Sequence, residues 1–486
     1  AGQDCGQPNP VCTASINVGN PGYQAYGNYC DFPGGGTNCL ASGERGSCWY
    51  TIPINANGVL TFDIVPNDWP GSPSTFSTDY DFAVWKIAGA SSTTCAGIAA
   101  GATPDRCNYS GLGVTGLFSN ANGTSPGAYP GFGPAYMAEL NVNNGDVYVL
   151  CISNFSNSTS GFTINFGGAS PINYTAAGST VTWTGGSNTS WTLASNWGGC
   201  TPPACGISAI VGPSSFAQPS LPAGNFYANN ININAGGTLT LQAGANLHVC
   251  GNFSNSGSLV CNPGSTITFD GGAAAQLCIG SLVGADAIGN LVVTKTGGSL
   301  TLNNNIDCKG SITMTNGTSV LNMNGRYVKV AGNFTNFNGG TTVTNTAAST
   351  LEFNGTAAQT YTQGASLLTL NNVLMNHTGP GVTCATNMVL GTAGTLTLTL
   401  GRIITNAFEV QVTNNASAAC TPGNAASFVQ GNLRRYLNGA ATSYDLPVGS
   451  PTTGYQRANI TFTTVTTIPQ LLARFDNYAP PIGPFA

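Results

Sequence analysis

The sequence predicts an all-β protein with an N-terminal antiparallel β-sandwich, a central parallel β-helix and the start of a C-terminal β-sandwich. Charged residues number only 29 of 486, the sum of 12 Lys and Arg and 17 Asp and Glu. Glycine (66) and proline (27) are abundant, and short runs of alternating apolar residues recur along the chain. Such a composition disfavours helices and suits short strands joined by turns. An apolar share of 41% still supplies a hydrophobic core.

Residues 1–170 are predicted to form a disulfide-rich β-sandwich. Short alternating runs separated by Gly, Pro, Asn and Ser are typical of this architecture. The runs are CWYTIPI (48–54), GVLTFDIVP (58–66), DYDFAVWKI (79–87), YMAELNV (136–142), DVYVLCISNF (146–155) and GFTINF (161–166). A period of two places Trp49 and Trp85 on an outer or edge face of their strands.

Sixteen cysteines indicate disulfides rather than a zinc site, because the chain has only two histidines and no paired CxxC motifs. Eight cysteines precede residue 170 and eight follow it, so each half is able to close on itself. We expect short-range pairs such as Cys95 with Cys107 and Cys200 with Cys205, although spacing does not fix connectivity. Oxidised cysteines predict an extracellular or cell-surface protein, and a start at Ala1 without methionine predicts that a signal peptide has been removed.

Residues 171–205 are predicted to be a linker and a tryptophan-rich cap. Trp183, Trp191 and Trp197 make up half of the six tryptophans. We favour a hydrophobic plug, because the ends of a solenoid must be covered to stay soluble. The alternative is a platform on which these three rings stack against a glycan.

Residues 206–424 contain an internal repeat. GNFSN at 251 returns as GNFTN at 332, TITFDGGAAAQ at 266 as TLEFNGTAAQ at 350, and NLVVTKTGG at 290 as NVLMNHTGP at 372, a unit of about 82 residues. Runs such as INI, LTL and LHV are too short to be stable singly. Stacked as a parallel β-helix with about 20 residues per coil, residues 229–398 would form about eight or nine coils.

Residues 425–486 return to longer alternating runs, SFVQGNLRRYLNG (427–439), YDLPVGS (444–450) and YQRANITFTTV (455–465). These runs predict the start of a C-terminal β-sandwich. The ending PPIGPFA does not resemble the end of a domain, so we expect this sandwich to be incomplete and the parent chain to continue beyond Ala486.

Charge and hydropathy exclude two classes of partner. A net charge of −5 without a basic stripe predicts no binding of nucleic acid. No window approaches the roughly 18 consecutive apolar residues of a membrane span.

A candidate calcium site lies near the third run of the sandwich. Asp79 and Asp81 flank Tyr80, so a strand would point both carboxylates to one face, and Asp63 and Asp68 lie on nearby segments. Carboxylate oxygens are ligands that calcium prefers. The alternative is that these four residues are solvated turn and edge positions. Calcium is the only cofactor that the sequence suggests.

The sequence predicts no catalytic residues. Asp270 and Glu352 occupy nearly equivalent positions of the two repeat units, about four coils apart, which is too far for a glycosidase pair. His248 and His377 lack a nearby nucleophile elbow and an acid in strand register, so we expect both at ordinary rung positions. A β-helix polysaccharide lyase is the remaining enzymatic alternative.

Three stretches together resemble the large surface proteins of Bacteroidota that the type IX secretion system exports. YDFAVWK (80–86), RCNYSG (106–111) and residues 145–168 are similar to the pre-peptidase-C-like or CUB-like sandwiches of gliding-motility-associated proteins. WTGGSNTSWTLASNWG (183–198) is similar to the segment that opens their β-helical regions, and GNLRRYLNG with YDLPVGS to the module that closes them. The resemblance implies export, adhesion, gliding or polymer contact, and related sandwiches often hold calcium. It implies no defined reaction.

We therefore expect an extracellular structural or adhesive protein that acts as a rigid β scaffold. It would be an adhesin, or the subunit of a surface layer or filament whose partner is a second copy of itself. The alternative is a glycan-binding module of a larger secreted protein, with extracellular glycans as partners.

Overall fold

The computed structural model describes most of the chain. The described residues are 2–6, 8–19, 31, 40, 43–71, 78–87, 92–111, 113–118, 135–167, 169–172, 180–185, 188–198, 200–213, 217–315, 318–336, 343–344, 349–364, 369–438, 442–463 and 470–476. About 52% of the protein is strand and 3% is helix, which confirms the all-β prediction. The chain divides into two compact units, Ala1–Pro202 with Ser214–Gln218 and Pro203–Pro213 with Pro219–Ala486.

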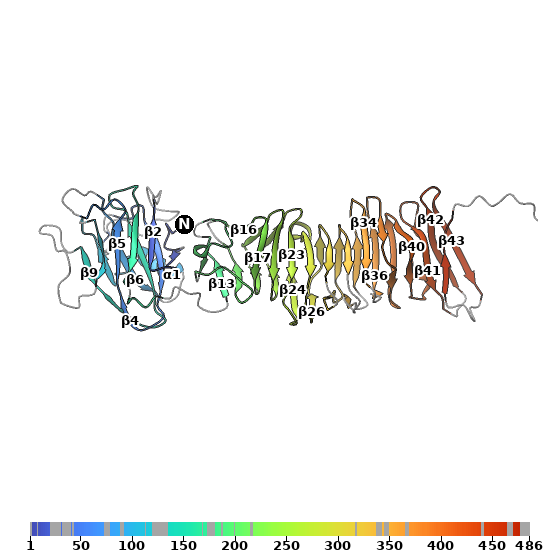
Figure 1. The fold of residues 1–486 in the computed structure, drawn as a ribbon, viewed down its shortest axis with the longest axis horizontal. Coiled ribbons are helices and arrows are strands. Elements are labelled where there is room, and N and C mark those ends of the chain that lie inside the picture. The colour runs from blue at the N-terminus through green and yellow to red at the C-terminus, as the bar shows by residue number, and fades with distance from the viewer. Residues whose placement is uncertain are drawn as a thin grey trace, which may run out of the picture. The chain divides into compact units, whose positions relative to one another are not determined.

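The first unit contains two five-stranded sheets and a two-stranded one (Figure 1). One sheet has the order β1 (Asn9–Pro10), β3 (Cys48–Pro53), β11 (Val147–Ser153), β6 (Asp81–Ile87) and β7 (Arg106–Asn108). The other has the order β2 (Ser15–Val18), β12 (Phe162–Phe166), β5 (Phe62–Pro66), β8 (Thr115–Phe118) and β9 (Tyr136–Ala138), and β4 (Gly58–Leu60) pairs with β10 (Leu140–Val142). Most neighbours pair antiparallel, while β1 with β3 and β8 with β9 pair parallel.

The sandwich has a second core that the simple alternation does not predict. Trp49 and Trp85 do point to the opposite side from the main core, but they are only 0% and 3% exposed. Their rings stack with centroids 5.8 Å apart. Ile98 of helix α1 (Ser92–Ala99) packs in the same cluster, and Trp85 Nε1 donates to the carbonyl of Ala102 at 2.9 Å. The expected outer or edge placement is therefore wrong, because additional chain covers this face.

The disulfides differ from the expected short-range pairs. Cys5 joins Cys95, Cys12 joins Cys200 and Cys205 joins Cys250. The bond from Cys12 to Cys200 connects the two halves of the chain, so the halves do not close separately.

Seven cysteines of the described residues are free and buried, which corrects the expectation that cysteines serve as disulfides throughout. They are Cys48, Cys151, Cys261, Cys278, Cys308, Cys384 and Cys420. Burial raises the pKa of their thiols. Such residues act as small apolar side chains inside the protein.

The second unit is a parallel β-solenoid of about 13 turns, which confirms the predicted central β-helix (Figure 1). A typical coil contributes one strand to each of three sides. The first sheet contains β15 (Ser208–Val211), β18 (Ile231–Ile233), β21 (Phe253–Asn255), β24 (Gln276–Gly280), β26 (Ser299–Leu302), β29 (Val320–Asn322) and β32 (Val343–Thr344). The middle sheets contain β16 (Ser220–Leu221), β19 (Thr238–Leu241) and β22 (Ser258–Cys261), then β27 (Ile306–Cys308), β30 (Tyr327–Val330), β33 (Thr350–Phe353), β36 (Asn372–Asn376) and β39 (Leu396–Leu400).

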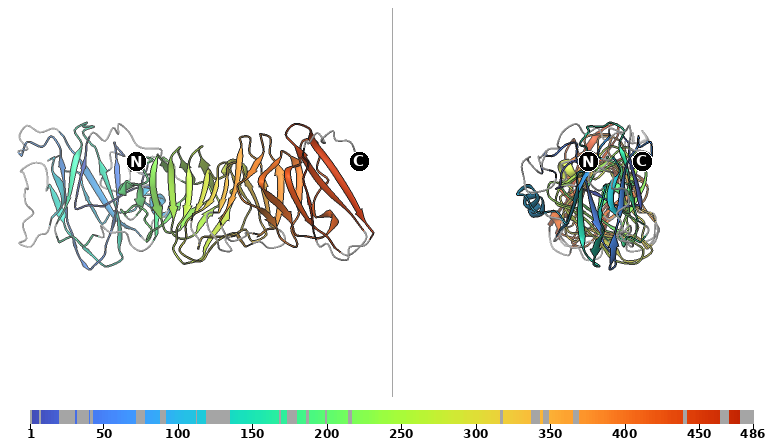
Figure 2. Two further views of the ribbon diagram at one scale, coloured as in Figure 1. Left: turned by 45° about the vertical axis from the view of Figure 1, so that its right-hand side comes forward. Right: turned by 90° about the vertical axis from the view of Figure 1, so that its left-hand side faces the viewer.

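The third side is one long sheet, whose strands lie side by side in Figures 1 and 2. Its order begins β17 (Gly224–Ala228), β20 (Ala245–Val249), β23 (Thr266–Phe269), β25 (Asn290–Val293), β28 (Ile312–Met314), β31 (Phe334–Asn336), β34 (Gln359–Gln363) and β37 (Val382–Cys384). It continues with β40 (Ile403–Val412), β41 (Val429–Tyr436), β42 (Thr442–Ser450) and β43 (Gly454–Phe462), while β35 (Thr369–Leu370), β38 (Met388–Leu390) and β44 (Gln470–Ala473) pair beside this path.

The segment expected to start a C-terminal sandwich contributes β41 to β44 to this long sheet. β41 pairs parallel with β40 and β42, and antiparallel with β44. The two arginines of GNLRRYLNG are structural. Arg434 forms a two-point ion pair with Glu409 at 2.7 Å, and the buried Arg435 donates to the carbonyls of Asp445, Ala416 and Ser417.

The repeat of about 82 residues is not a whole number of coils. Ile231 pairs with Phe253 and Phe253 with Cys278, which are steps of 22 and 25 residues. Equivalent strands therefore lie on different sides, as β20 in the long sheet and β30 in a middle sheet do.

The duplicated unit nevertheless keeps its internal hydrogen bonds. The amide of buried Gln276 donates to the carbonyls of Val249 and Gly251, and its oxygen accepts from the Gly271 N–H. Gln359 of the second copy does the same with Val330, Gly332 and Gly355.

In most strands of the coils, such as β18, β19 and β20, alternate residues point inward and are buried. Ile267, Leu291 and Ile312 are in register on three successive coils and are each at most 1% exposed. These aliphatic rows fill the interior.

We predict that Leu291→Ala lowers the stability of the solenoid by about 2–5 kcal/mol, because it leaves a cavity between two coils. Val260→Ala, on a side chain that is 38% exposed, is the control and changes stability by less than about 0.5 kcal/mol. Urea unfolding curves of the two variants measure the difference. Equal curves would contradict a packed interior.

Candidate functional site

Two of the four predicted calcium ligands come together at the start of β6. Asp81 is the first residue of this strand and is 5% exposed, and Asp79 precedes it by two residues. Oδ1 of each carboxylate is buried and accepts no hydrogen bond within the described part of the chain. A side chain at Gly111 would lie 3.8 Å from Asp79 Oδ2, so the 109–111 segment runs close beside the pair.

The two carboxylates destabilise each other in their charged forms. Burial raises the pKa of Asp79 to about 6. Burial and then the charge of Asp79 raise the pKa of Asp81 to about 8, against the lowering effect of Arg45. Two acids that each bury an unpartnered oxygen favour a proton or a bound cation at this position.

The other two aspartates have protein partners. Asp68 Oδ2 accepts hydrogen bonds from Thr78 at 2.8 Å and Ser160 at 3.0 Å. Asp63 lies in β5 and accepts a hydrogen bond from Tyr136, which lowers its pKa against the larger raising effect of burial. In the described ranges, no group of three or more His, Cys, Asp and Glu side chains is placed to hold a metal. Calcium at Asp79 and Asp81 would thus need carbonyl, hydroxyl or water oxygens as well.

The three predicted stacking tryptophans form a closed aromatic cluster. Trp183 pairs with Trp197 across β13 (Thr180–Trp183) and β14 (Trp197–Gly198). Trp191 precedes the short helix η2 (Ala194–Asn196). The ring of Trp197 meets those of Trp183 and Trp191 edge to face, with centroids 5.0 and 4.8 Å apart. All three residues are at most 3% exposed, so a glycan would find no open ring face here.

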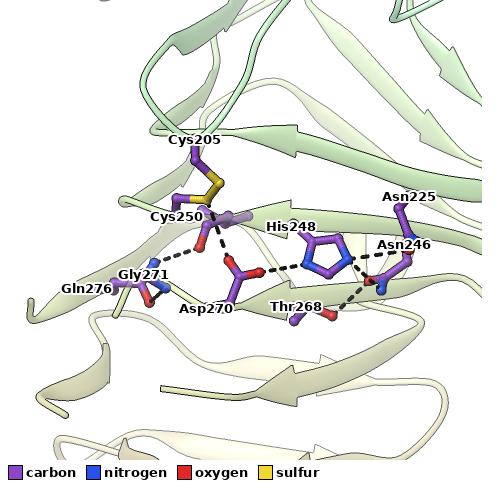
Figure 3. Close-up of polar contacts among 10 residues, drawn as sticks. Cys205, Asn225, Asn246, His248, Cys250, Thr268, Asp270, Gly271 and Gln276 are labelled. Atoms are coloured by element: carbon purple, nitrogen blue, oxygen red, sulfur yellow. Dashed lines mark hydrogen bonds and ion pairs between the residues drawn. A yellow bond between two sulfur atoms is a disulfide. The ribbon is translucent and has the colours of Figure 1, made fainter. Parts of the chain in front are cut away.

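A different polar cluster lies on the outer face of the long sheet, at its first three strands (Figure 3). His248 of β20 stands between Tyr227 of β17 and Asp270, which follows β23. Its Nδ1 lies 2.7 Å from Asp270 Oδ2, and its ring stacks on Tyr227 with centroids 4.6 Å apart and an interplanar angle of 22°. Its Nε2 lies 2.9 Å from Asn246 Nδ2 and 3.4 Å from Asn225 Oδ1.

Hydrogen-bond partners fix the tautomer of this imidazole. Because a carboxylate only accepts, His248 donates from Nδ1 to Asp270, and Nε2 accepts from the Asn246 amide. The Asn246 oxygen in turn accepts from Thr268 at 2.7 Å. Asp270 thus orients the imidazole of His248 on the solenoid surface. The disulfide sulfur of Cys250 lies 3.6 Å from Asp270 Oδ1 and covers one side of the carboxylate.

No acid is in strand register with His248, as expected, because its register partner on the next coil is Thr268. Asp270 lies two residues beyond that partner, just past the end of β23, and reaches the imidazole from there. Strand register alone therefore did not indicate this pair. His377 behaves as expected: it is 1% exposed, its Nε2 lies 2.9 Å from the Ala357 carbonyl, and its Nδ1 accepts from the Gly379 N–H.

The two acids at nearly equivalent repeat positions do not meet. Asp270 follows β23 of the long sheet, while Glu352 lies in β33 of a middle sheet. Glu352 accepts hydrogen bonds from Tyr327 and Asn376 at 2.7 Å each. That the protein is not an enzyme stays a prediction.

Comparisons of the chain with protein-family models, with curated proteins and with solved structures found no match. The resemblance to type IX-secreted surface proteins therefore stays a prediction. Among the helices of the described residues, none is long and apolar enough to cross a membrane.

Proposed function

We propose that the protein is a rigid extracellular scaffold, an adhesin or the subunit of a surface layer or filament. The observation that carries the proposal is the long solenoid sheet, in which main-chain pairing continues without a break from β17 to β43. In such a solenoid each coil contacts only its neighbours, and main-chain bonds join one coil to the next along the stack. The disulfides Cys5–Cys95, Cys12–Cys200 and Cys205–Cys250 support an oxidising environment.

The last strand of this path supports assembly with a second copy. β43 pairs with β42 over all nine of its residues, and within the described part of the chain its other edge pairs with no strand. It contains no proline, and its one charge, Arg457, is held by Asp445 in an ion pair. An open edge of this length readily accepts a strand from another chain.

We expect the purified protein to form filaments or sheets in negative-stain images. Neighbouring residues of a strand direct their N–H groups to opposite edges. Of Ala458→Pro and Asn459→Pro, one therefore removes an N–H group from the free edge of β43 and leaves the hydrogen bonds to β42 intact. That variant should lose assembly, while Val260→Ala should keep it. Monodisperse wild-type particles at all concentrations would contradict the subunit proposal.

We further propose that the sandwich binds calcium at Asp79 and Asp81. The unpartnered Oδ1 atoms support this, because a divalent cation would neutralise both carboxylates. The cation would stabilise the sandwich by linkage and would contribute no reaction.

In EDTA, which removes calcium, the free energy of unfolding of the sandwich should fall as the pH rises from about 4 to about 8. The folded-state pKa values of Asp79 and Asp81 lie above the ordinary value near 4, so the folded sandwich holds its protons more tightly than the unfolded chain does. At pH 8, calcium at about 100 times its Kd should raise the melting temperature by about 5–10 °C in calorimetry.

Two variants distinguish calcium binding at Asp79 and Asp81 from the general effect of buried acids on stability. Asp81→Asn should weaken the pH dependence and abolish the response to calcium. Glu44→Gln is the matched control, because burial raises the pKa of Glu44 to about 7 but its oxygens accept hydrogen bonds from Ser47 and the Asp31 N–H. It should keep the response. An equal response in Asp81→Asn would refute this site.

A second candidate function is a glycan-binding module. The exposed ring of Tyr227, beside His248 and Asp270, supports this function. A glycan would bind there and not at the three buried tryptophans.

A further inference from the structure

The outer face of the long sheet carries aromatic side chains at its first two strands, β17 and β20. One outward row runs through Tyr227, His248, Thr268, Val292 and Thr313 in register. Only its first two members are aromatic. Tyr227 is 42% exposed although one face of its ring lies against the imidazole, and its hydroxyl has no hydrogen bond within the described residues.

The fold does not require this arrangement. In the second copy of the repeat, Asp307 stands to Lys329 as Tyr227 stands to His248 in the first. Asp307 and Lys329 form an ion pair at 3.7 Å. Equivalent coils are therefore stable with an ordinary surface ion pair. Folding alone does not explain why Tyr227 stacks on His248 and why Asp270 orients the imidazole.

The groups around Tyr227 match the chemistry of a sugar. An exposed aromatic ring offers a flat apolar surface to the C–H face of a pyranose. Asn225 is exposed on the same strand, and Asn246 and His248 follow on the next, so planar donors and acceptors stand beside the ring at fixed positions (Figure 3). A few placed polar groups beside an apolar surface are what orient a small ligand.

Charge restricts the class of sugar. Asp270 is the acid of the cluster. Lys295 is the basic side chain that interacts electrostatically with Asp270, and it is 0% exposed. Lys295 Nζ donates inward to the Ala274 carbonyl and to Gln276. An anionic glycan would thus meet a carboxylate without an accessible cation in this cluster.

We propose that Tyr227, Asn225, Asn246 and His248 form a binding site for a neutral, pyranose-containing glycan. Tyr227 stacks on the sugar ring, the amides of Asn225 and Asn246 bond its hydroxyls, and Asp270 positions the His248 ring that supports Tyr227 and Asn246. The proposal rests on the second candidate function and is independent of assembly through β43.

The test uses the full chain and a fixed panel of polymers. Neutral cellulose, xylan, mannan, β-1,3-glucan and chitin are compared with anionic alginate and cationic chitosan in affinity electrophoresis or pull-down, and calorimetry follows with oligosaccharides of the retained polymer. We expect retention by at least one neutral polymer and by neither charged one.

Variants assign the binding to this site. Tyr227→Ala should lower the affinity at least about tenfold, which is about 1.4 kcal/mol, while Tyr227→Phe should lower it less. Asp270→Asn should also weaken binding, because it frees the imidazole to turn. The control is Phe408→Ala, which removes another exposed aromatic ring from the same sheet.

Three outcomes would overturn the proposal: no neutral polymer is retained, Tyr227→Ala binds as the wild type does, or only charged polymers bind. A purely structural role would instead lower the melting temperature of Tyr227→Ala and leave affinity unchanged. Because images of assembly do not depend on Tyr227, failure here and failure of the scaffold proposal are distinguishable.

Discussion

Main-chain hydrogen bonds between successive coils are the interaction on which the second unit depends. Its strands are mostly three to five residues long, too short to be stable alone. Each becomes stable because the coil before it and the coil after it satisfy its N–H and C=O groups, as in the row from Ile267 through Leu291 to Ile312. Aliphatic side chains then fill the interior.

This dependence on neighbours has two consequences for function. Outward positions are free to vary because they do not hold the coils together, so the same rungs carry a tyrosine, histidine and aspartate in one copy of the repeat and an ion pair in the other. The end of the stack remains a template for pairing unless it is covered, and β43 leaves a long edge. The proposed ligand site and the proposed assembly edge thus lie on separate parts of one solenoid.

Local patterns in the sequence were sufficient to predict the fold class and the central solenoid. Short alternating runs and the return of GNFSN as GNFTN carry that information, because strand alternation and repetition are properties of the sequence itself. Contacts that depend on what covers a face were not predictable. Trp49 and Trp85 have the expected parity, yet they are buried because α1 packs over them.

Long-range pairing escaped prediction for the same reason. The partners of Cys95 and Cys200 lie 90 and 188 residues away, which no local spacing indicates. The pair of His248 and Asp270 escaped it as well, because the register partner of His248 is Thr268 and Asp270 lies two residues further along the chain. Asp79 and Asp81 were predicted as a pair because the two members of a D-x-D pattern share one side of a strand.

Cysteine pairs on the outer face test the parallel stacking most directly. Thr313 pairs in register with Thr335, and Thr335 with Thr362. Adjacent strands are about 4.8 Å apart, a separation that a disulfide spans, and strands two coils apart are not bridged. Mild oxidation should therefore cross-link the double cysteine variants at 313 with 335 and at 335 with 362, and not the one at 313 with 362. Cross-linking of 313 with 362, or of neither adjacent pair, would contradict the solenoid.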